Sequence, residues 1–396
     1  MVPSALLPQD APAPPRIASR WRDVFRRRVL SLFLGRLFAA VERQLCEPGQ
    51  LPARGIHRIL ICRPNHRLGN AILVSPLLAE VEALYPGAEI DLVVGGEAAS
   101  HLFANRFQVR RIFSLPRKIA RHLWRTRGLL RELRRNSYDL AIDSSQGSQS
   151  GRLLLLMVKA RFKLGFPDPE TKPGSAWHGL PCPDHLAQRG VFLLRAARGQ
   201  EQGRPYPPLN LDLSDGEKQQ ARRALANILG TSPLLPAGRT IVGIFANATG
   251  AKCYGEDWWQ RFVGALMEQR PDVLLVDVLA EHGRSQLGGD FAPYYTRDLR
   301  RLASMVANMD GFISADCGVM HLAAASGTPT LGLFSVTAPS KYAPYGGLNG
   351  AIDTHGMSAA EVAGMAADWL GGVVPAAQPQ PAVPSMRDGA AFPFRG

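Results

Sequence analysis

The chain has 396 residues, of which 46% are hydrophobic and 20% are charged. This length allows two domains with sizeable cores, and the composition excludes a fibrous or wholly disordered chain. The formal net charge of +13 is unevenly placed. Residues 16–45 hold eight arginines against Asp23 and Glu42, and residues 106–135 hold eleven lysines and arginines against Glu132 alone. Such stretches indicate a surface for an anionic partner, which is a nucleic acid, a membrane surface or a phosphorylated substrate.

The cysteines and the apolar segments indicate the cellular compartment of the protein. The five cysteines form no CxxC pair and no closely spaced framework, which is typical of a reducing compartment. The apolar stretch 29–41 is interrupted by Arg36 and follows three arginines, so it is too short and too charged to span a bilayer. We therefore expect a cytoplasmic protein, and a peripheral position at the inner face of the cytoplasmic membrane is compatible with this.

The beginning of the chain carries a helical pattern after a tail. Residues 1–15 and 373–396 are rich in proline and alanine, and we expect both to be disordered. Residues 16–50 are predicted to hold a basic amphipathic helix, because apolar residues recur there at spacings of three and four with arginines on the other side. Two interpretations stay open: the helix lies on an anionic membrane, or it packs on the globular body with its arginines solvated.

The remainder of the chain alternates short apolar runs with helical patterns, which predicts parallel sheets covered by helices on both faces. An N-terminal domain (56–198) and a C-terminal domain (239–372) are separated by residues 199–238, which are rich in proline, glycine and glutamine and are interpreted as a linker holding one helix. We expect two doubly wound, Rossmann-like α/β domains that face a central cleft. The expected strands are 57–62, 89–94, 112–115, 138–143, 162–166, 240–245, 273–279, 311–314 and 330–334. The expected helices are 70–85, 118–135, 149–159, 217–229, 257–269, 298–309, 318–325 and 358–370.

Three loops at the carboxyl ends of expected strands are the candidate ligand contacts, because ligands of such sheets bind there. In the first, residues 63–70 (RPNHRLGN), Gly69 allows a tight turn before a helix whose first N–H groups suit an anion or a sugar hydroxyl. Any Rossmann-like domain needs a turn at this place, so the loop alone is weak evidence of binding.

The second loop, residues 246–254 (ANATGAKCY), offers the amide of Asn247, the hydroxyl of Thr249 and the ammonium of Lys252. These groups suit a diphosphate, with Lys252 neutralising the leaving group. An ordinary surface lysine is the alternative.

The third loop, residues 314–322 (SADCGVMHL), would bring Asp316 to the edge of the cleft, and Gly318 would let backbone N–H groups approach a phosphate. Asp316 as a helix cap and His321 as a structural histidine are the alternatives.

Together these stretches resemble glycosyltransferase family 9, the ADP-heptose:lipopolysaccharide heptosyltransferases. FISADCGVMHLAAASGTPTLGLFSVTAP is similar to the D-x-G-x-x-H-L-x-A-A signature of the family, and RILICRPNHRLGNAILVSPLL and ANATGAKCYGEDWWQRF resemble its first loop and its donor loop. The resemblance covers about residues 56–370 and implies a GT-B fold, with a nucleotide sugar such as ADP-heptose bound by the C-terminal domain and a lipopolysaccharide-core acceptor bound by the N-terminal domain.

The resemblance also implies roles for single residues. The donor-binding residues would be Asn247, Thr249, Lys252, Asp316, Cys317, Gly318 and His321, and the acceptor-binding residues would be Arg63, Arg67, Gly69 and Asn70. Asn70, Lys252 and Asp316 are the catalytic candidates on this resemblance, and His66 is a further catalytic candidate by its position at a strand end. No cofactor is expected beyond the donor substrate. No metal is expected either, since the sequence has no D-x-D arrangement.

Asn70 departs from the family, which commonly has at this place an aspartate proposed as the general base. An amide cannot take a proton from a hydroxyl at neutral pH. Another residue could be the base, with His66 and Asp143 as candidates, or Asn70 only orients the acceptor, or the protein binds sugar without transferring it. The favoured function is therefore an inverting sugar transferase, with a non-catalytic sugar or nucleotide binder as the alternative. Nucleic-acid binding is the weakest hypothesis, because no RRM, KH or helix-turn-helix pattern is present.

Overall fold

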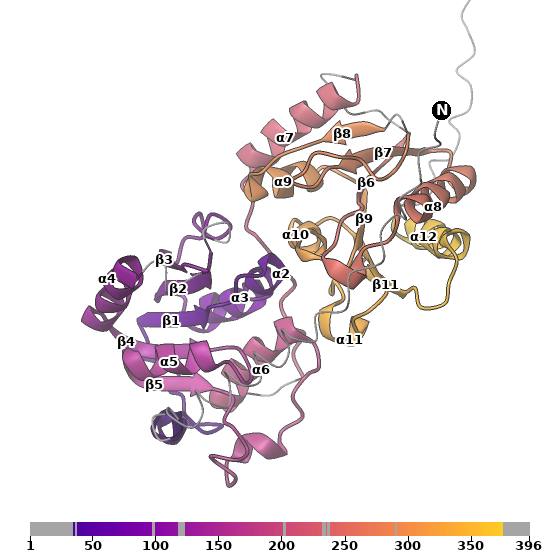
Figure 1. Cartoon of the computed structure of the whole chain (residues 1–396). Coiled ribbons are helices and arrows are strands. Elements are labelled where there is room, and N and C mark those ends of the chain that lie inside the picture. Colours follow the sequence, from indigo (N-terminus) through magenta and orange to yellow (C-terminus); the bar gives the residue numbers. More distant parts are fainter. Residues whose placement is uncertain are drawn as a thin grey trace, which may run out of the picture.

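The computed structural model describes residues 35, 38–96, 100–117, 123–200, 203–231, 235, 238–289 and 291–374. They form two α/β domains that lie side by side (Figure 1). The predicted tails, residues 1–15 and almost all of 373–396, lie outside the described residues, as does most of the predicted basic helix.

The N-terminal domain is built on a five-stranded parallel sheet of order β3-β2-β1-β4-β5. Its first strand is central, so the chain winds outward in both directions from β1. Its elements are β1 (Arg58–Arg63), α2 (Leu68–Ile72), α3 (Ser75–Leu84), β2 (Glu89–Gly95), β3 (Val109–Leu115), α4 (Leu123–Arg135), β4 (Ser137–Asp143), α5 (Gln149–Met157), β5 (Lys159–Gly165), η2 (Ala176–Gly179) and α6 (Leu186–Ala197).

The C-terminal domain repeats this plan with a six-stranded parallel sheet of order β11-β10-β9-β6-β7-β8. Its elements are α7 (Asp215–Ile228), β6 (Thr240–Phe245), η3 (Gly250–Lys252), α8 (Glu256–Gln269), β7 (Val273–Val278), β8 (Ala292–Tyr294), α9 (Leu299–Val306), β9 (Gly311–Ala315), α10 (Gly318–Ala325), β10 (Thr330–Phe334), α11 (Pro339–Tyr342), β11 (Gly350–Asp353) and α12 (Ala359–Val373). Two doubly wound domains are therefore present, as the alternation of strands and helices predicts.

The structure differs from the expected elements in three places. The single helix expected at 70–85 is two helices, α2 and α3, because Pro76 lies in the first turn of α3 and a proline cannot continue a preceding helical turn. Helix α6, the short helix α11 and the short strands β8 and β11 were not predicted. The helix of the expected linker, α7, packs on α9 and β8, so this part of residues 199–238 belongs to the C-terminal domain.

The end of the predicted basic helix packs on the N-terminal domain. Residues 38–44 are helical, and Val41 and Leu45 are buried in one cluster with Phe113 of β3 and Leu133 of α4. Glu42 is also buried, and its carboxylate lies 2.6 Å from the Nε of Arg152. This end of the segment is therefore part of the body. Residues 16–34, which would decide whether the rest lies on a membrane, are outside the described residues.

The domains meet through apolar helices and one buried arginine. Helix α2 of the N-terminal domain packs on α10 of the C-terminal domain, and one hydrophobic cluster includes residues of both domains (Figure 1). Arg300 of α9 donates to the carbonyl oxygens of Leu102 (2.9 Å) and Leu211 (3.1 Å), so it ties α9 to the N-terminal domain and to the connection.

Candidate active site

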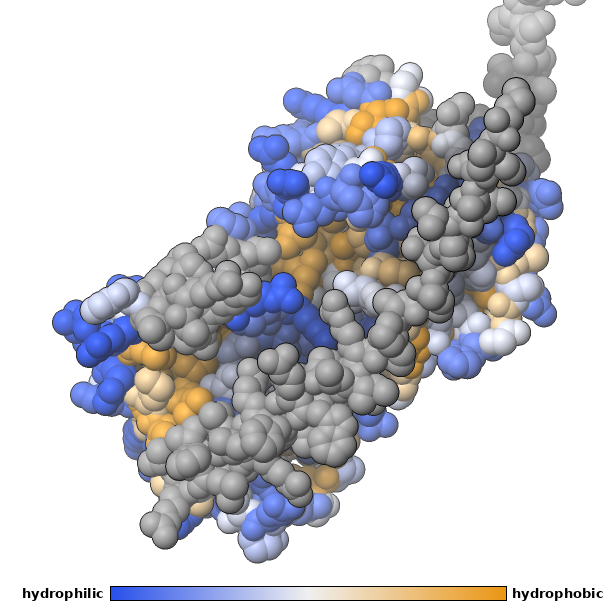
Figure 2. All heavy atoms as spheres, in the orientation of Figure 1, coloured by the Kyte–Doolittle hydropathy of each residue, from blue (hydrophilic) through white to orange (hydrophobic). Residues whose placement is uncertain are grey.

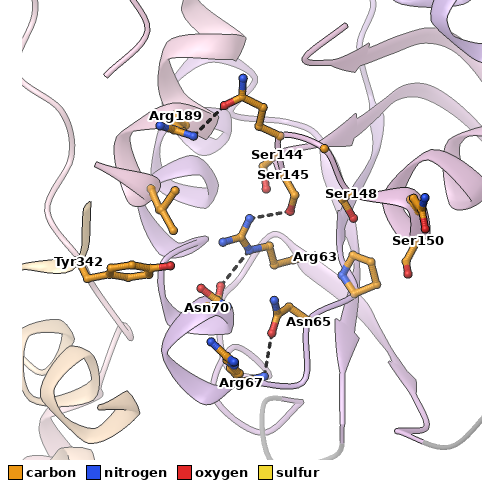
Figure 3. Close-up of a pocket in the computed structure, with 15 residues that line it drawn as sticks. Arg63, Asn65, Arg67, Asn70, Ser144, Ser145, Ser148, Ser150, Arg189 and Tyr342 are labelled. Atoms are coloured by element: carbon orange, nitrogen blue, oxygen red, sulfur yellow. Dashed lines mark hydrogen bonds between the residues drawn. The ribbon is translucent and has the colours of Figure 1, made fainter. Parts of the chain in front are cut away.

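A polar cavity of about 450 Å³ opens at the carboxyl ends of β1 and β4. Its walls come from the loops after these two strands, from α6, and from Tyr342 of the C-terminal domain, which reaches across from α11 (Figure 3). The lining residues are Arg63, Pro64, Asn65, Arg67, Asn70, Ser144, Ser145, Gln146, Gly147, Ser148, Gln149, Ser150, Leu186, Arg189 and Tyr342. Three of these described residues are arginines and none is acidic, so the cavity favours an anionic or hydroxyl-rich ligand.

Arg63 holds two walls of the cavity together. Its guanidinium donates through Nε to the backbone oxygen of Asn70 (3.0 Å) and through Nη1 to the hydroxyl of Ser145 (2.6 Å), as Figure 3 shows. The side chain is buried, and this burial lowers the pKa of the guanidinium. Arg63 therefore fixes the position of Asn70 relative to the serine-rich loop and brings a positive charge to the cavity.

The other residues predicted in the first loop divide between two places. Asn70 and Arg67 line the cavity, and the side-chain oxygen of Asn65 accepts a hydrogen bond from the Arg67 backbone N–H (2.9 Å). Gly69 instead faces α10, where an added Cβ would come within 2.7 Å of the Cδ2 of His321. Gly69 therefore serves the contact between the domains.

His66 does not line the cavity. Its ring lies near Gly96, at the end of β2, and the charge of Arg117 adds to partial burial in lowering the pKa of the imidazole. His66 belongs to the opposite side of the first loop from Asn70.

Asp143 ends β4 but is fully buried beneath the cavity. Its carboxylate accepts a hydrogen bond from the backbone N–H of Ser145 (3.1 Å) and lies 3.5 Å from a guanidinium nitrogen of Arg152. Desolvation raises the pKa of Asp143 to about 7. A carboxyl group with no exposed surface cannot reach an acceptor hydroxyl, so Asp143 supports the cavity floor and does not fit as the general base.

Across the cleft, Lys252 and Asp316 form an ion pair. The Nζ of Lys252, at the end of η3, lies 2.5 Å from the Oδ2 of Asp316, which follows β9. The hydroxyl of Thr337 donates to the same oxygen, and the ring of Tyr342 lies below the ammonium group, 5.8 Å from Nζ to the ring centre. Two loops that are 64 residues apart in the sequence are thus joined at the carboxyl ends of adjacent strands, β6 and β9.

The side chains of Lys252 and Asp316 differ in their exposure to solvent. The side chain of Lys252 is 26% exposed, whereas that of Asp316 is 5% exposed. Asp316 therefore holds the lysine from beneath, while the ammonium group still reaches solvent. A positioned cation of this kind can stabilise negative charge that develops on a departing diphosphate.

The remaining predicted donor residues follow the same two strands, β6 and β9. Asn247 follows β6, and its side-chain oxygen lies 3.4 Å from the Nε2 of His282, while Thr249 is exposed just before η3. Cys317 is extended at the start of α10, with its sulfur 3.4 Å from the hydroxyl of Ser314. Gly318, the first residue of α10, comes so close to Leu68 that an added Cβ would lie 2.8 Å from the Cβ of that leucine.

His321 is buried between the domains. Its exposed fraction is 3%, burial lowers its pKa to about 4, and its Nδ1 has no hydrogen-bond partner among the described residues. The ring is therefore neutral at physiological pH. Its contact with Gly69 supports the structural interpretation, in which His321 helps to join α2 and α10.

Comparisons with known proteins agree with this arrangement. Residues 126–363 match the family model described as glycosyltransferase family 9 (heptosyltransferase), which is more than half of the chain. The chain belongs to this family.

The relatives named here are similar to the chain over most of its length. It is 27% identical over 304 residues to lipopolysaccharide heptosyltransferase 1 of Pseudomonas aeruginosa, covering 73% of this chain and 81% of that protein. Among solved structures, the E. coli heptosyltransferase WaaC with ADP has a TM-score of 0.60 at 18% identity and covers 79% of this chain and 98% of its own. A family 9 glycosyl transferase from Veillonella parvula has a TM-score of 0.61 at 16% identity, covering 77% and 87%.

The family and these folds confirm three predictions from the sequence. The chain is a glycosyltransferase of family 9, it is of the heptosyltransferase type, and its two facing Rossmann-like domains form a GT-B fold. In the described part of the chain, no helix is both long enough and apolar enough to cross a membrane.

Several residues of this glycosyltransferase site were missed by the sequence analysis. Ser144–Ser150 form one wall of the cavity, and their position after a predicted strand that ends in Asp143 was a usable signal. Arg189, Thr337 and Tyr342 had no comparable signal, because each lies in an ordinary helix or loop. They reach the site only through the packing of distant segments.

Proposed function

We propose that this glycosyltransferase transfers a heptose from ADP-heptose, with inversion, to an anionic acceptor of the lipopolysaccharide-core type. One observation carries the proposal: Lys252, held by Asp316, lies over Tyr342, which also lines a cavity that has three arginines and no acidic residue among its described lining. The lysine suits a diphosphate leaving group, and the arginines suit phosphates or carboxylates on the acceptor. The names of the similar proteins support the donor: one is a lipopolysaccharide heptosyltransferase, and two structures of WaaC contain ADP and ADP-2-deoxy-2-fluoro heptose.

The donor would occupy the C-terminal domain around the Lys252–Asp316 pair, with Asn247, Thr249 and the start of α10 as further contacts. The acceptor would occupy the cavity of the N-terminal domain, with Arg63, Arg67 and Asn70 as contacts. Tyr342 belongs to both places, since it lines the cavity and lies under the Lys252 ammonium. The reacting carbon would then lie between the two domains near Tyr342.

The role of Asn70 follows from what surrounds it. The two candidates for a separate general base do not line the cavity, because Asp143 is buried and His66 faces Gly96. We infer that Asn70 orients the acceptor hydroxyl and that stabilisation of the departing diphosphate supplies most of the rate acceleration. In this mechanism the proton passes late to solvent water, when the hydroxyl oxygen has become more acidic through formation of its bond to the sugar carbon and the bond from that carbon to the diphosphate has broken.

The experiment is a transfer assay with ADP-heptose and a heptose-deficient lipopolysaccharide acceptor, read as ADP release and as acceptor mass. Replacing Lys252 by alanine should lower the rate by about a hundredfold, because one charge-assisted contact to a leaving group contributes on the order of 3 kcal/mol. Lys341→Ala is the matched control, since this exposed lysine lies on α11 close in sequence to Tyr342. Equal rates in all three proteins would remove Lys252 from the mechanism.

A non-catalytic sugar-nucleotide binder is the second candidate, and Asn70 is the observation that favours it. Such a protein would bind ADP-heptose, as seen by calorimetry, and would release no ADP with any acceptor. Measured turnover by the native protein excludes it.

A further inference from the structure

Three charged side chains are buried beneath the cavity, and they come from three different elements. Glu42 lies in the helical segment 38–44, Arg152 lies on α5 and Asp143 ends β4, with exposed fractions of 3%, 6% and 0%. The Nε of Arg152 lies 2.6 Å from a carboxylate oxygen of Glu42, and its Nη1 lies 3.5 Å from a carboxylate oxygen of Asp143. Replacing buried ion pairs by apolar residues is often neutral or stabilising, so stability alone does not account for this network.

The surrounding backbone leaves room for these side chains. A Cβ added at Gly165 of β5 would collide with a guanidinium nitrogen of Arg152, and one added at Gly151 of α5 would collide with the carboxylate of Asp143. Arg152 also donates a hydrogen bond to the carbonyl oxygen of Phe166, which follows β5. The guanidinium is therefore held in a defined place between α5 and β5.

Asp143 connects this network to the wall of the cavity. Its carboxylate accepts a hydrogen bond from the backbone N–H of Ser145 (3.1 Å), and the hydroxyl of Ser145 accepts one from Arg63 (2.6 Å). Arg63 in turn donates to the backbone oxygen of Asn70 (3.0 Å), and Figure 3 shows the two contacts of Arg63. A continuous series of ion pairs and hydrogen bonds therefore runs from Glu42 to Asn70.

Glu42 joins this series from the outer edge of the sheet. Leu45 pairs with Lys163 of the edge strand β5, and Figure 1 shows this indigo segment beside β5. The second carboxylate oxygen of Glu42 accepts a hydrogen bond from the backbone N–H of Asp168 (3.1 Å). The cavity lies at the other end of the series, where the two domains face each other and hydrophilic residues gather at the centre of Figure 2. A segment that precedes β1 is therefore linked to the cavity without lining it.

The guanidinium of Arg152 is shared unequally between its two carboxylates. It is closer to Glu42 than to Asp143, and because attraction falls with distance, Glu42 takes the larger part of it. Asp143 is thereby left free to accept the hydrogen bond from Ser145. If the charge of Glu42 were removed, Asp143 would be the remaining carboxylate of the network. The guanidinium would then draw Asp143 away from Ser145, and the cavity wall would lose this anchor.

We propose that Glu42 is a positioning residue for the acceptor. By balancing the charge of Arg152, it keeps Asp143 bound to the cavity wall. The acceptor depends on this wall and on Arg63, whereas the cation for the diphosphate is Lys252 of the other domain. The network therefore affects binding of the acceptor and leaves binding of the donor unchanged. The assignment to the acceptor rests on the proposed function, whereas the action of Glu42 on Asp143 does not.

The first test compares the kinetics of the two substrates. Glu42→Gln keeps the shape of the side chain and removes its charge, so the KM for the lipopolysaccharide acceptor should rise about tenfold, as expected when a hydrogen bond to a charged group is weakened. The kcat and the KM for ADP-heptose should stay within about twofold of the native values, because only acceptor binding is lost. Asp143→Ala removes the oxygen that accepts from Ser145, cuts the series at a second point and should raise the acceptor KM in the same way.

Gln44→Ala is the matched control. Gln44 is exposed on the same N-terminal segment, and its side chain accepts a hydrogen bond from Lys163 (3.0 Å) outside the series. This variant should leave both KM values unchanged. Melting temperatures should show that all three variants are folded at the temperature of the assay.

The second test needs no transfer reaction. Burial raises the pKa of Asp143 to about 7, and the charge of Glu42 adds to this rise, while Arg152 and Arg63 oppose it; the protonated thiol of Cys62 is also near. In Glu42→Gln the pKa of Asp143 should therefore fall. The stability contributed by the Asp143 proton is lost as the pH rises through the folded-state pKa, so urea unfolding should show this loss at a lower pH than in the native protein.

An unchanged acceptor KM in Glu42→Gln and Asp143→Ala would overturn the proposal. So would an equal rise in Gln44→Ala, equal rises in the KM values of both substrates, or an unshifted pH profile of unfolding in Glu42→Gln. Absence of transfer by the native protein would instead contradict the proposed function, and the unfolding profile would still decide whether Glu42 acts on Asp143.

Discussion

At the scale of single residues, the site combines exposed groups that can touch substrate with buried groups that hold them. Lys252 and Asn70 reach the cleft, and Arg63 lines the cavity with its guanidinium engaged by Asn70 and Ser145. Asp316 and Asp143 lie beneath the surface with their carboxylates engaged. Buried charges are tolerated when they are paired. Removal of one partner leaves an unpaired buried charge, which destabilises the folded protein. Each substrate-facing residue of this enzyme therefore depends on a buried neighbour.

Asn70 provides a direct test of how the acceptor hydroxyl is activated. Asn70→Ala should reduce the transfer rate, because the hydroxyl loses an orienting amide, while binding of ADP stays unchanged. Asn70→Asp should increase the rate little, since a carboxylate in a loop built around an amide lacks partners to hold it in place. A large gain in rate with Asn70→Asp would show that the native chain lacks a base. The measurement is the rate of ADP release at saturating donor.

Asp143 should make stability fall as the pH rises through neutrality. Its folded-state pKa is raised to about 7, above the value of about 4 expected in the unfolded chain, so the stability contributed by its bound proton is fully present below about pH 4 and is lost as the pH rises through 7. In Asp143→Asn this component should be absent from urea unfolding measured between pH 4 and 8. Transfer activity should remain, because Asp143 does not line the cavity.

Asp139→Asn is the control of opposite sign. Hydrogen bonds from the backbone N–H groups of His57 and Arg58 lower the pKa of Asp139, so its contribution is present above the unfolded pKa and is lost as the pH falls. Identical pH profiles for the native protein and Asp143→Asn would contradict the raised pKa.

At the scale of elements, the contact between α2 and α10 places the two halves of the site next to each other. The first loop leads into α2 and the third loop leads into α10, and the two helices approach where Gly69 and Gly318 leave room. The packing of elements also decides how much of the N-terminus can be removed. Because Val41, Glu42 and Leu45 are buried, a truncation that removes residues 1–45 would cut into the core, whereas one that ends at residue 34 would not touch the described contacts.

Gly318→Ala should therefore impair both stability and transfer. The new Cβ would lie 2.8 Å from the Cβ of Leu68 and 3.0 Å from the backbone nitrogen of Gly69, so one helix must move. Overpacking of this kind costs about 1–3 kcal/mol. Gly128→Ala on α4 is the matched control, since nothing lies within 4 Å of its Cβ, and it should be neutral or slightly stabilising. Thermal unfolding and the transfer assay check both, and equal melting temperatures for the two variants would refute the packing argument.

At the scale of the whole molecule, the packing of α2 on α10 and a shared hydrophobic cluster join the two domains. The connection also takes part, because the backbone N–H of Leu211 donates to the carbonyl oxygen of Ala325 at the end of α10 (3.0 Å). Between the start of α6 and the end of α11, the Nε2 of His185 lies 2.7 Å from the carbonyl oxygen of Ala343. The cavity and the Lys252–Asp316 pair are therefore held in a defined relation even before a substrate binds.

Arg300→Ala should separate the unfolding of the two domains. Its guanidinium is buried and donates to the carbonyl oxygens of Leu102 and Leu211 and to the carboxylate of Glu217, so its removal takes a donor from two buried carbonyl oxygens, while Ser214 still donates to Glu217. Leaving a buried acceptor unsatisfied costs about 1–3 kcal/mol. Calorimetry should show two transitions in place of one. Arg301→Ala, whose side chain is 79% exposed, should leave the profile unchanged; one unaltered transition in both variants would argue against the role of Arg300.

The sequence by itself determined the fold class, the order of the two domains and the loops that carry Lys252, Asp316 and Asn70. These depend on local patterns: the period of apolar residues, and short motifs at strand ends. Only the tertiary structure decided that Asp143 is buried, that His66 turns away from the cavity, and that Tyr342 and Arg189 join it. These facts arise from contacts between segments that are far apart in the chain. The local sequence of each segment does not show which distant segment it will contact.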